Sequence, residues 1–458
     1  MLKVYNTLNN KKEEFKPLRD NKVSFYLCGP TVYDSAHLGH GRSATAFDII
    51  RRYLIYKDYD VEFVSNYTDI DDKMINRANE EGISVKELSD KIIPLYVKDY
   101  AELGILEPDK QPKATEHIQD IIEIIKKLEE KGATYSLEDG VYFDISKFSD
   151  YGKLSGQNLD ELQMGARVAV NEAKRNPQDF VLWKLEKPGE PSWESPWGKG
   201  RPGWHIECSA MCKAILGESI DFHAGGADLA FPHHECEVAQ SEVAHGEPFA
   251  KYWLHNGFIN IDNEKMSKSL GNFITLRDML DKYTGPVIRY LYLQTHYRSP
   301  INFTDALLEQ SKQSLQRIHD FVNSIKRINK AGESHKEVES AIKNALEQFE
   351  EAMDDDFETP NALASLFEFI KYINTQKIDL NNSDKDHILE YLQNIDKVFA
   401  VIMPDEESLS EELLALIKER EQARAEKDWA KSDELRDKLK EEGILVEDTP
   451  EGTIWKKI

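Results

Sequence analysis

The feature that most restricts how this chain can fold is a strand, loop, helix, strand pattern over residues 22–66. KVSFYLC (22–28) is a β-rich apolar run, and residues 37–59 then show apolar side chains at helical spacing. DVEFVSN (60–66) follows as a second buried strand. Such a βαβ unit predicts a parallel sheet, and ligands of parallel sheets bind at the carboxyl edge.

The α/β pattern is interrupted and then resumes. Residues 116–131 are expected to form a helix and 133–146 a hairpin with a Glu-Asp-Gly turn. The Gly- and Pro-rich stretch 187–203 excludes a helix or a central strand, and indicates the exit of an inserted module. Strands are predicted again at 219–224 and 252–261, with a helix from about Pro232 to Ala244 between them.

The last third of the chain has a different pattern. From Thr304 onward the strands give way to long helical segments that predict a helical bundle, with breaks near Gly332, Thr359–Pro360, Asn381–Ser383 and Pro404. A charged helix is expected over 410–442, followed by two short strands. Within 418–440, eight Lys and Arg stand against seven Asp and Glu, so this stretch lacks the acidic bias of the whole chain.

Composition limits the classes of protein that this chain can belong to. At 458 residues it exceeds a single core, which stops growing near ~250 residues. With 40% hydrophobic and 31% charged residues, no signal peptide and no apolar run of membrane-spanning length, we expect a cytoplasmic, non-membrane protein. The net charge of −25 argues against a general nucleic-acid coat but leaves room for a local basic patch.

The four cysteines are too few for a disulfide framework in a cytosolic chain of this length. They are expected to be core thiols, metal ligands or a nucleophile.

A candidate phosphate site lies at HLGH (37–40), between the first strand and its helix. Unpaired main-chain N–H groups and the helix dipole attract anions at such a position. Gly39 allows close approach of the main chain, and His37 and His40 can donate hydrogen bonds to phosphate oxygens.

KMSKS (265–269) follows a predicted strand, and Lys265 and Lys268 can neutralise charge on a departing pyrophosphate. Together the two motifs resemble the signatures of the class I aminoacyl-tRNA synthetases. HLGH departs from that family's His-Ile-Gly-His only at Leu38. The resemblance implies a nucleotide-binding, Rossmann-like domain split by an insertion, and activation of an amino acid with ATP and magnesium. HAGGADLAF (223–231) is similar to the family's adenosine-binding region, with Asp228 as a candidate acceptor for a ribose hydroxyl.

FPHHECEVAQ (231–240) is dense in metal-binding side chains. On a helix that starts at Pro232, His233 and Glu237 share a face. Cys28 and Cys208 can complete a zinc set at the sheet edge. Spacing alone does not decide the set, because Cys212, Cys236 and His234 could each replace a member.

Five stretches and the tail make the whole chain resemble the cysteinyl-tRNA synthetases: CGPTVYDSAHLGHGR, NYTDIDDKMI, GRPGWHIECSAM, FPHHECEVAQ, KMSKSLGN and DELRDKLKEEGILVEDTPEGTIW. This resemblance implies one zinc ion at the active site, held by Cys28, Cys208, His233 and Glu237, that binds the thiol of the substrate L-cysteine. It also implies that Thr68 and Trp204 line the amino-acid pocket, and that tRNA(Cys) is the acceptor. Cys212, Cys236 and His234 are then expected to pack or to support the ligands.

The resulting expectation is an α/β protein with five segments. Two catalytic halves (1–115 and 201–303) flank an α+β insertion (116–200), and an α-helical bundle (304–404) and a small anticodon-side domain (405–458) follow. A monomer is expected. One alternative is a cysteine ligase that passes the adenylate to an amino sugar, against which the long tail argues. The other is a non-catalytic, zinc-containing tRNA-binding relative, against which the intact ATP motifs argue.

Overall fold

The computed structural model describes residues 1–157, 173–266, 272–404, 411–449 and 452–457. The chain divides into two compact units, Met1–Met403 and Pro404–Ile458. Within the described residues, no helix has the length and the apolar character needed to cross a membrane.

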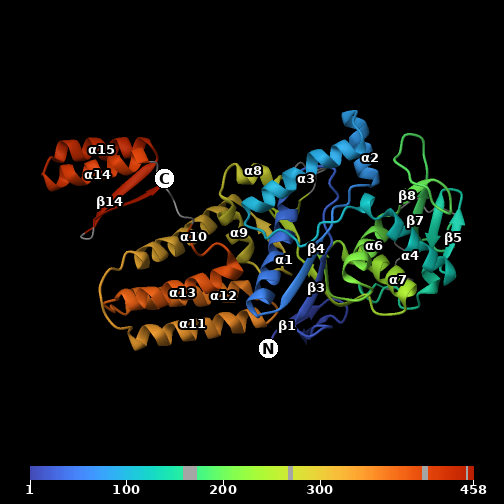
Figure 1. Cartoon of the computed structure of the whole chain (residues 1–458), viewed down its shortest axis with the longest axis horizontal. Coiled ribbons are helices and arrows are strands. Elements are labelled where there is room, and N and C mark those ends of the chain that lie inside the picture. Colours follow the sequence, from blue (N-terminus) through green and yellow to red (C-terminus); the bar gives the residue numbers. More distant parts are fainter. Residues whose placement is uncertain (158–172, 267–271, 405–410, 450–451, 458) are drawn as a thin grey trace. The chain divides into compact units, whose positions relative to one another are not determined.

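A four-stranded parallel sheet lies at the centre of the first unit (Figure 1). Its order is β10 (Ala250–Asn256), β9 (Ile220–Gly226), β3 (Lys22–Leu27) and β4 (Asp60–Ser65). Phe25 of β3 lies opposite Phe63 of β4 and Phe222 of β9, and its ring centroid is 4.9 and 5.2 Å from theirs. Helix α1 (Leu38–Tyr56) connects β3 to β4, which confirms the predicted βαβ unit.

The inserted module has a sheet and a core of its own. Antiparallel strands β5 (Thr134–Leu137), β6 (Gly140–Phe143), β7 (Phe180–Leu185) and β8 (Gly200–Pro202) pack with α4 (Ile118–Glu130). Ile206 and Ala210 of α6 (Trp204–Leu216), and Cys236 and Ala239 of α7 (Glu235–His245), are buried in the same core. One side of each of these two helices therefore packs on the insertion.

The remaining elements of the α/β part are short strands and helices of various lengths, of which the one at Ile145–Lys147 belongs to the insertion. They are β1 (Lys3–Asn6), β2 (Lys11–Glu14), α2 (Asp72–Glu81), α3 (Val85–Glu102), η1 (Ala114–Glu116), η2 (Ile145–Lys147), η3 (Ala230–His234), α8 (Leu276–Leu280) and α9 (Gly285–Leu293). A separate three-stranded sheet has the order β12 (Glu264–Lys265), β11 (Ile259–Ile261) and β13 (Ile301–Phe303).

The predicted strand over 252–261 is therefore two strands. β10 ends at Asn256, and β11 begins at Ile259 in a different sheet. Between the two strands, the Gly257 N–H donates to the Tyr297 carbonyl at 2.8 Å, outside the parallel sheet. This approach requires glycine, because a Cβ atom there would lie 2.6 Å from the main-chain carbonyl of Ser299.

The helical bundle has the predicted breaks. It contains α10 (Asp305–Lys326), α11 (Lys336–Asp354), α12 (Thr359–Thr375) and α13 (Asn382–Phe399). These helices belong to the same compact unit and share one apolar core with the parallel sheet.

The second unit contains α14 (Glu411–Ala425), α15 (Trp429–Glu441), β14 (Ile444–Thr449) and β15 (Gly452–Lys457). The single helix expected over 410–442 is thus two helices. Lys427 has a φ of 61°, which helical residues do not adopt, and the Asp428 side chain caps α15 by accepting from the main-chain N–H of Lys431.

Candidate active site and metal centre

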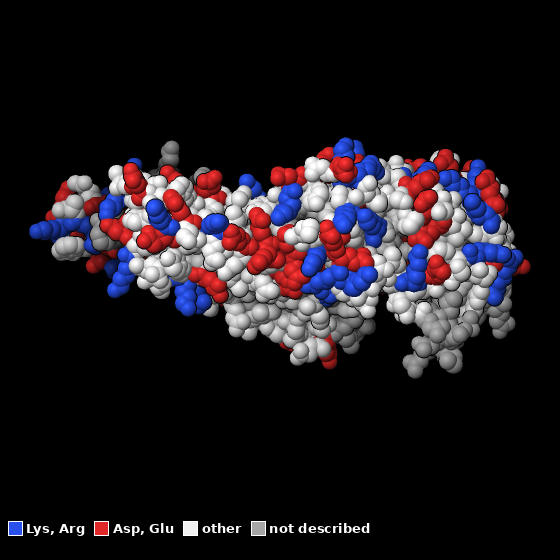
Figure 2. Space-filling model, turned by 90° about the horizontal axis from the view of Figure 1, so that it is seen from below, with Lys and Arg blue, Asp and Glu red and all other residues white. Residues whose placement is uncertain are grey.

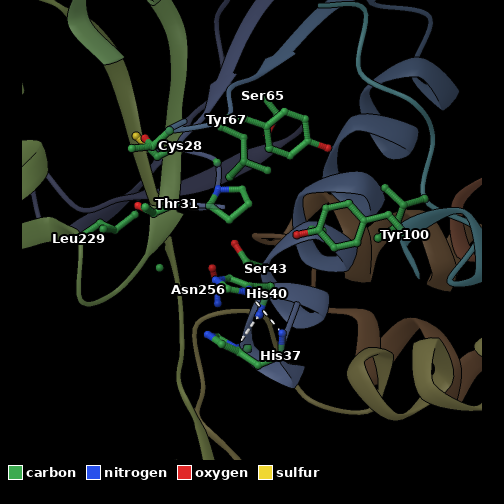
Figure 3. Close-up of a pocket in the computed structure, with 18 of the residues that line it drawn as sticks. Cys28, Thr31, His37, His40, Ser43, Ser65, Tyr67, Tyr100, Leu229 and Asn256 are labelled. Carbon is green, nitrogen blue, oxygen red and sulfur yellow. Dashed lines mark hydrogen bonds between the residues drawn. The ribbon is translucent and has the colours of Figure 1, made fainter. Parts of the chain in front are cut away.

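The parallel strands place the ends of four segments at one edge of the sheet, around a cavity of about 760 Å³ (Figure 3). Cys28 follows β3, Thr68 lies beyond β4, Asp228 follows β9, and Asn256 ends β10. Nine of the residues singled out from the sequence line this cavity: Cys28, His37, Gly39, His40, Thr68, Trp204, Cys208, Asp228 and His233.

Four side chains of the types that bind metal ions meet beside one wall of the cavity, and three of them, Cys28, Cys208 and His233, line it. One ligand atom from each of Cys28, Cys208, His233 and Glu237 lies within 4.8 Å of the others, and all four residues are buried. The Cys28 sulfur is 3.5 Å from the Cys208 sulfur, 3.7 Å from His233 Nε2 and 3.4 Å from Glu237 Oε1. Two sulfurs on a tetrahedral zinc ion stand roughly 3.8 Å apart, so the spacing suits this metal.

The chemistry of this cluster also suits a cation. Burial raises the pKa of the Cys28 thiol well above its ordinary value, and the neighbouring Cys208 and Glu237 raise it further. Two thiols packed together out of water favour their protonated forms, whereas a bound divalent cation favours the thiolates.

Four elements supply these ligands. Cys28 directly follows β3, Cys208 lies in α6, His233 in η3 and Glu237 in the first turn of α7. The helix expected from Pro232 begins regularly only at Glu235, after the short η3 segment. His233 Nε2 nevertheless lies 3.1 Å from Glu237 Oε1, so the predicted shared face is present.

A second set of donors overlaps the first. Cys28, His223, His234 and Glu237 also lie within 4.8 Å of one another. Neither His223 nor His234 lines the cavity, and His234 Nδ1 lies 2.9 Å from His255 Nε2. Three members of the first set line the cavity, so only that set can present a metal ion to a ligand there.

Two histidines that the sequence analysis missed support the ligands. His223 Nε2 lies 3.0 Å from Glu237 Oε2, and His205 Nδ1 lies 2.9 Å from His233 Nδ1. Trp204 stacks on the His233 ring with centroids 4.3 Å apart. The only sequence signal was a histidine inside the buried strand pattern of 219–224, and one beside Trp204.

The HLGH histidines form the start of α1. His37 is the N-cap, its Nδ1 accepts from the main-chain N–H of His40, and His40 Nδ1 accepts from that of His37, at 3.3 Å each (Figure 3). A nitrogen that accepts carries no proton, so each neutral ring bears its proton on Nε2. Burial holds the pKa of His40 well below its ordinary value, and the charge of the nearby Lys73 lowers it further. His40 is therefore a neutral donor at the cavity wall.

Gly39 and Gly226 leave room for the side chains of His37 and Asp228. A Cβ atom on Gly39 would lie 3.0 Å from the His37 ring, and one on Gly226 would lie 2.5 Å from Asp228 Oδ1. The Asp228 side chain is exposed on the cavity wall.

Thr68 is buried beside the segment that follows Cys28, since its main-chain N–H donates to Pro30 and its carbonyl accepts from Val32. The main chain of Lys265 lies in β12. Lys268 lies outside the described residues.

Comparison with known proteins agrees with this fold. The model of the class I (C) tRNA synthetase catalytic domain matches residues 14–313, a DALR domain matches 348–402, and the cysteinyl-tRNA ligase anticodon-binding domain matches 406–455. Similar folds occur in methionyl-tRNA synthetase from Mycobacterium tuberculosis with methionyl-adenylate (14% identity, TM-score 0.61, covering 84% of this chain and 92% of that one). They also occur in the leucyl-tRNA synthetase AgnB2 of Agrobacterium radiobacter K84 with tRNA (12% identity, TM-score 0.65, covering 85% of each chain).

The catalytic-domain match over residues 14–313 covers more than half of the chain and makes it a class I aminoacyl-tRNA synthetase. With its catalytic and anticodon-binding matches, the chain belongs to the cysteinyl-tRNA synthetase family. It is an ATP-dependent cysteine–tRNA ligase.

Proposed function

We propose that Cys28, Cys208, His233 and Glu237 hold one zinc ion, and that this site selects L-cysteine by its thiol. The observation that carries the proposal is that three of these ligands, Cys28, Cys208 and His233, line the cavity that also contains the HLGH histidines. Substrate thiol and ATP phosphates therefore bind to one continuous wall.

The cluster explains discrimination between cysteine and serine. A shape-based pocket distinguishes such similar side chains by only ~10- to 200-fold. A zinc ion at this site supplies a preference for a thiolate ligand over an alcohol, which stays protonated and coordinates poorly. Trp204 stacks over His233 and Thr68 lines the same cavity, so these side chains bound the space around the amino acid.

ATP occupies the other half of the cavity. His37 and His40 donate from Nε2 to phosphate oxygens, Gly39 lets the main chain approach them, and Asp228 accepts from a ribose hydroxyl. The cysteine carboxylate attacks the α-phosphorus, a P–O bond forms, and pyrophosphate leaves. Lys265 and Lys268, with magnesium, neutralise the charge on the leaving group.

The division of labour along the chain follows the five predicted segments. Residues 1–115 and 201–303 form the catalytic domain, 116–200 the insertion, 304–404 the bundle and 405–458 the anticodon-binding domain. Transfer is to tRNA(Cys), and the enzyme acts as a cytoplasmic monomer. The matched anticodon-binding domain supports the last segment of this scheme.

ATP–pyrophosphate exchange with each amino acid in turn tests the proposed function. Exchange should occur with cysteine and be lower by at least 1,000-fold with serine, beyond what shape alone provides. Exchange with serine within 200-fold of cysteine would mean that the metal does not select the substrate.

A further inference from the structure

Arg42, two residues beyond His40 on α1, has an unusual environment. Its side chain is buried, with 1% exposure, and among the described residues it forms no ion pair with a carboxylate. Its guanidinium instead donates to four main-chain carbonyls. These are Gly257 (3.3 Å, from Nε) and His296, Tyr297 and Ser299 (3.0, 3.2 and 2.7 Å, from Nη2).

Burying a guanidinium costs folding free energy unless its N–H groups find hydrogen-bond acceptors. Burial lowers the pKa of Arg42 to about 10, so the group stays charged at neutral pH. The planar fork of donors can hold several carbonyls in a fixed arrangement, which a lysine cannot reproduce.

The two segments that Arg42 binds form one platform, defined here as residues 256–261 and 296–303. The Gly257 N–H donates to Tyr297 O at 2.8 Å, and the Ile301 N–H donates to Phe258 O at 2.9 Å. β11 and β13 then pair in parallel. Gly257 has no room for a side chain against Ser299.

This platform leads directly to the second phosphate motif. β11 pairs antiparallel with β12, so that Asn260 lies opposite Lys265. Asn256, Gly257 and Phe258 also line the active-site cavity. Arg42 thus connects the start of α1, where the HLGH histidines lie, to the base of the β11–β12 hairpin.

The platform is held from its other side by the helical bundle. Asp356, in the turn between α11 and α12, is fully buried and accepts from Tyr297 Oη (3.0 Å) and Arg298 Nε (2.7 Å). His296 Nε2 donates to the Asp356 carbonyl at 2.8 Å. Within 296–299, three carbonyls therefore bind Arg42 of α1, and three side chains, those of residues 296–298, bind Asp356 of the bundle.

We propose that Arg42 is a positioning residue for cysteine activation. It fixes His37 and His40 relative to the β11–β12 hairpin, so that ATP bound at the HLGH histidines lies at a set spacing from the strand that contains Lys265. The inference rests on the phosphate-binding roles proposed above for both motifs.

The kinetic consequence is specific. Misplacing reacting groups by about 1 Å can cost ~100-fold in rate. Replacing Arg42 should lower kcat for pyrophosphate exchange by about 10- to 100-fold. KM for cysteine should change less than about twofold, because Arg42 contacts none of the proposed zinc ligands, nor Thr68 or Trp204.

The test compares Arg42→Lys with Arg289→Lys in the full-length enzyme. Arg289 is also fully buried and binds main-chain carbonyls of Phe399, Leu103 and Gly104. Unlike Arg42 it also pairs with a carboxylate, Asp48 of α1, and it does not bond to the platform. Both variants should lose thermal stability, and only Arg42→Lys should show the fall in kcat at unchanged KM for cysteine. If both variants keep wild-type kcat, or if both lose it equally, the positioning role is wrong.

Gly257→Ala provides a second test that leaves Arg42 intact and does not depend on the folding of Arg42→Lys. Its methyl group would displace the Ser299 main chain, so the same fall in kcat at unchanged KM is expected. Full activity of Gly257→Ala would overturn the inference. A wild-type enzyme without cysteine-dependent exchange would instead contradict the proposed function, so the two failures can be told apart.

Discussion

At the residue scale, His37 and His40 present a fixed tautomer to the cavity because each Nδ1 accepts a main-chain N–H. These donors are already oriented, so they need not reorganise when charge develops on the phosphate. Such preorganisation is the main source of electrostatic catalysis. The depressed pKa of His40 means that it acts as a neutral donor near neutral pH.

Replacing His40 should therefore remove a transition-state contact. We expect His40→Ala to lower kcat for cysteine-dependent pyrophosphate exchange by about 100- to 1,000-fold. The control His387→Ala, at an exposed position in the bundle, should leave kcat unchanged. A His40→Ala enzyme within tenfold of the wild type would show that the phosphates bind elsewhere.

The zinc ligands can be separated from the other buried thiols. Cys208→Ser should lose zinc and cysteine-dependent exchange together, with ATP binding retained. Cys212→Ser, one helical turn away and equally buried, should keep its zinc, because Cys212 belongs to neither donor group that the described residues form. Zinc content by atomic absorption and ATP affinity by equilibrium dialysis measure both. Loss of zinc from Cys212→Ser alone would contradict the assignment.

At the element scale, the turn between α11 and α12 joins the bundle to the platform beside the active site. Asp356 and Phe357 have φ angles of 67° and 58°, an unusual conformation for two consecutive non-glycine residues. The bonds to Asp356 from Tyr5 N, Tyr297 and Arg298 compensate for it.

Asp356→Asn should destabilise the first unit by about 2–4 kcal/mol, because it leaves Arg298 without its buried anionic partner. Asp379→Asn is a suitable control, since Asp379 pairs with Lys330 at the surface and such pairs contribute about 0–1 kcal/mol. Urea unfolding followed by circular dichroism measures both. Equal losses would show that the Asp356 contacts do not stabilise this turn.

Sequence patterns were sufficient to predict the elements that depend on residues close together in the chain. The βαβ unit at 22–66, the bundle breaks and the motif positions all follow from periodicity, Gly and Pro, or short motifs. The split at Gly257 and the support from His223 and His205 depend on contacts between distant segments, and single-chain periodicity carries no record of these.

The ligand set shows the same limit. Spacing placed His233 and Glu237 on one face, but it left Cys212, Cys236 and His234 open as alternatives, and only the family resemblance selected Cys28 and Cys208. The structure brings all four together at the end of β3, where α6, η3 and α7 converge.

At the scale of the whole molecule, the question is how an acidic enzyme binds tRNA. Figure 2 shows Lys and Arg interspersed with Asp and Glu over the described residues of the face that it presents. With a net charge of −25, the enzyme is expected to bind tRNA through limited local contacts rather than through a continuous basic surface.

The division of the chain into two compact units allows cysteine activation to be tested separately from tRNA charging. The second unit has its own small core of Ile417, Leu439, Ile444 and Val446, and Arg420 pairs with Asp448 within it. Removing residues 405–458 should leave cysteine-dependent exchange within about threefold of the wild type, while kcat/KM for tRNA charging falls by at least 100-fold. Normal charging by the truncated enzyme would make this unit a stability element.

The central claim is that the cluster of Cys28, Cys208, His233 and Glu237 holds zinc in order to bind the substrate thiol. X-ray absorption at the zinc edge, with and without cysteine, tests it most directly. The proposal predicts two sulfur ligands in the free enzyme, at ~2.3 Å, and a third on addition of cysteine but not of serine. A sulfur count that stays the same when cysteine binds would reduce the metal to a structural role and contradict the proposed basis of selectivity.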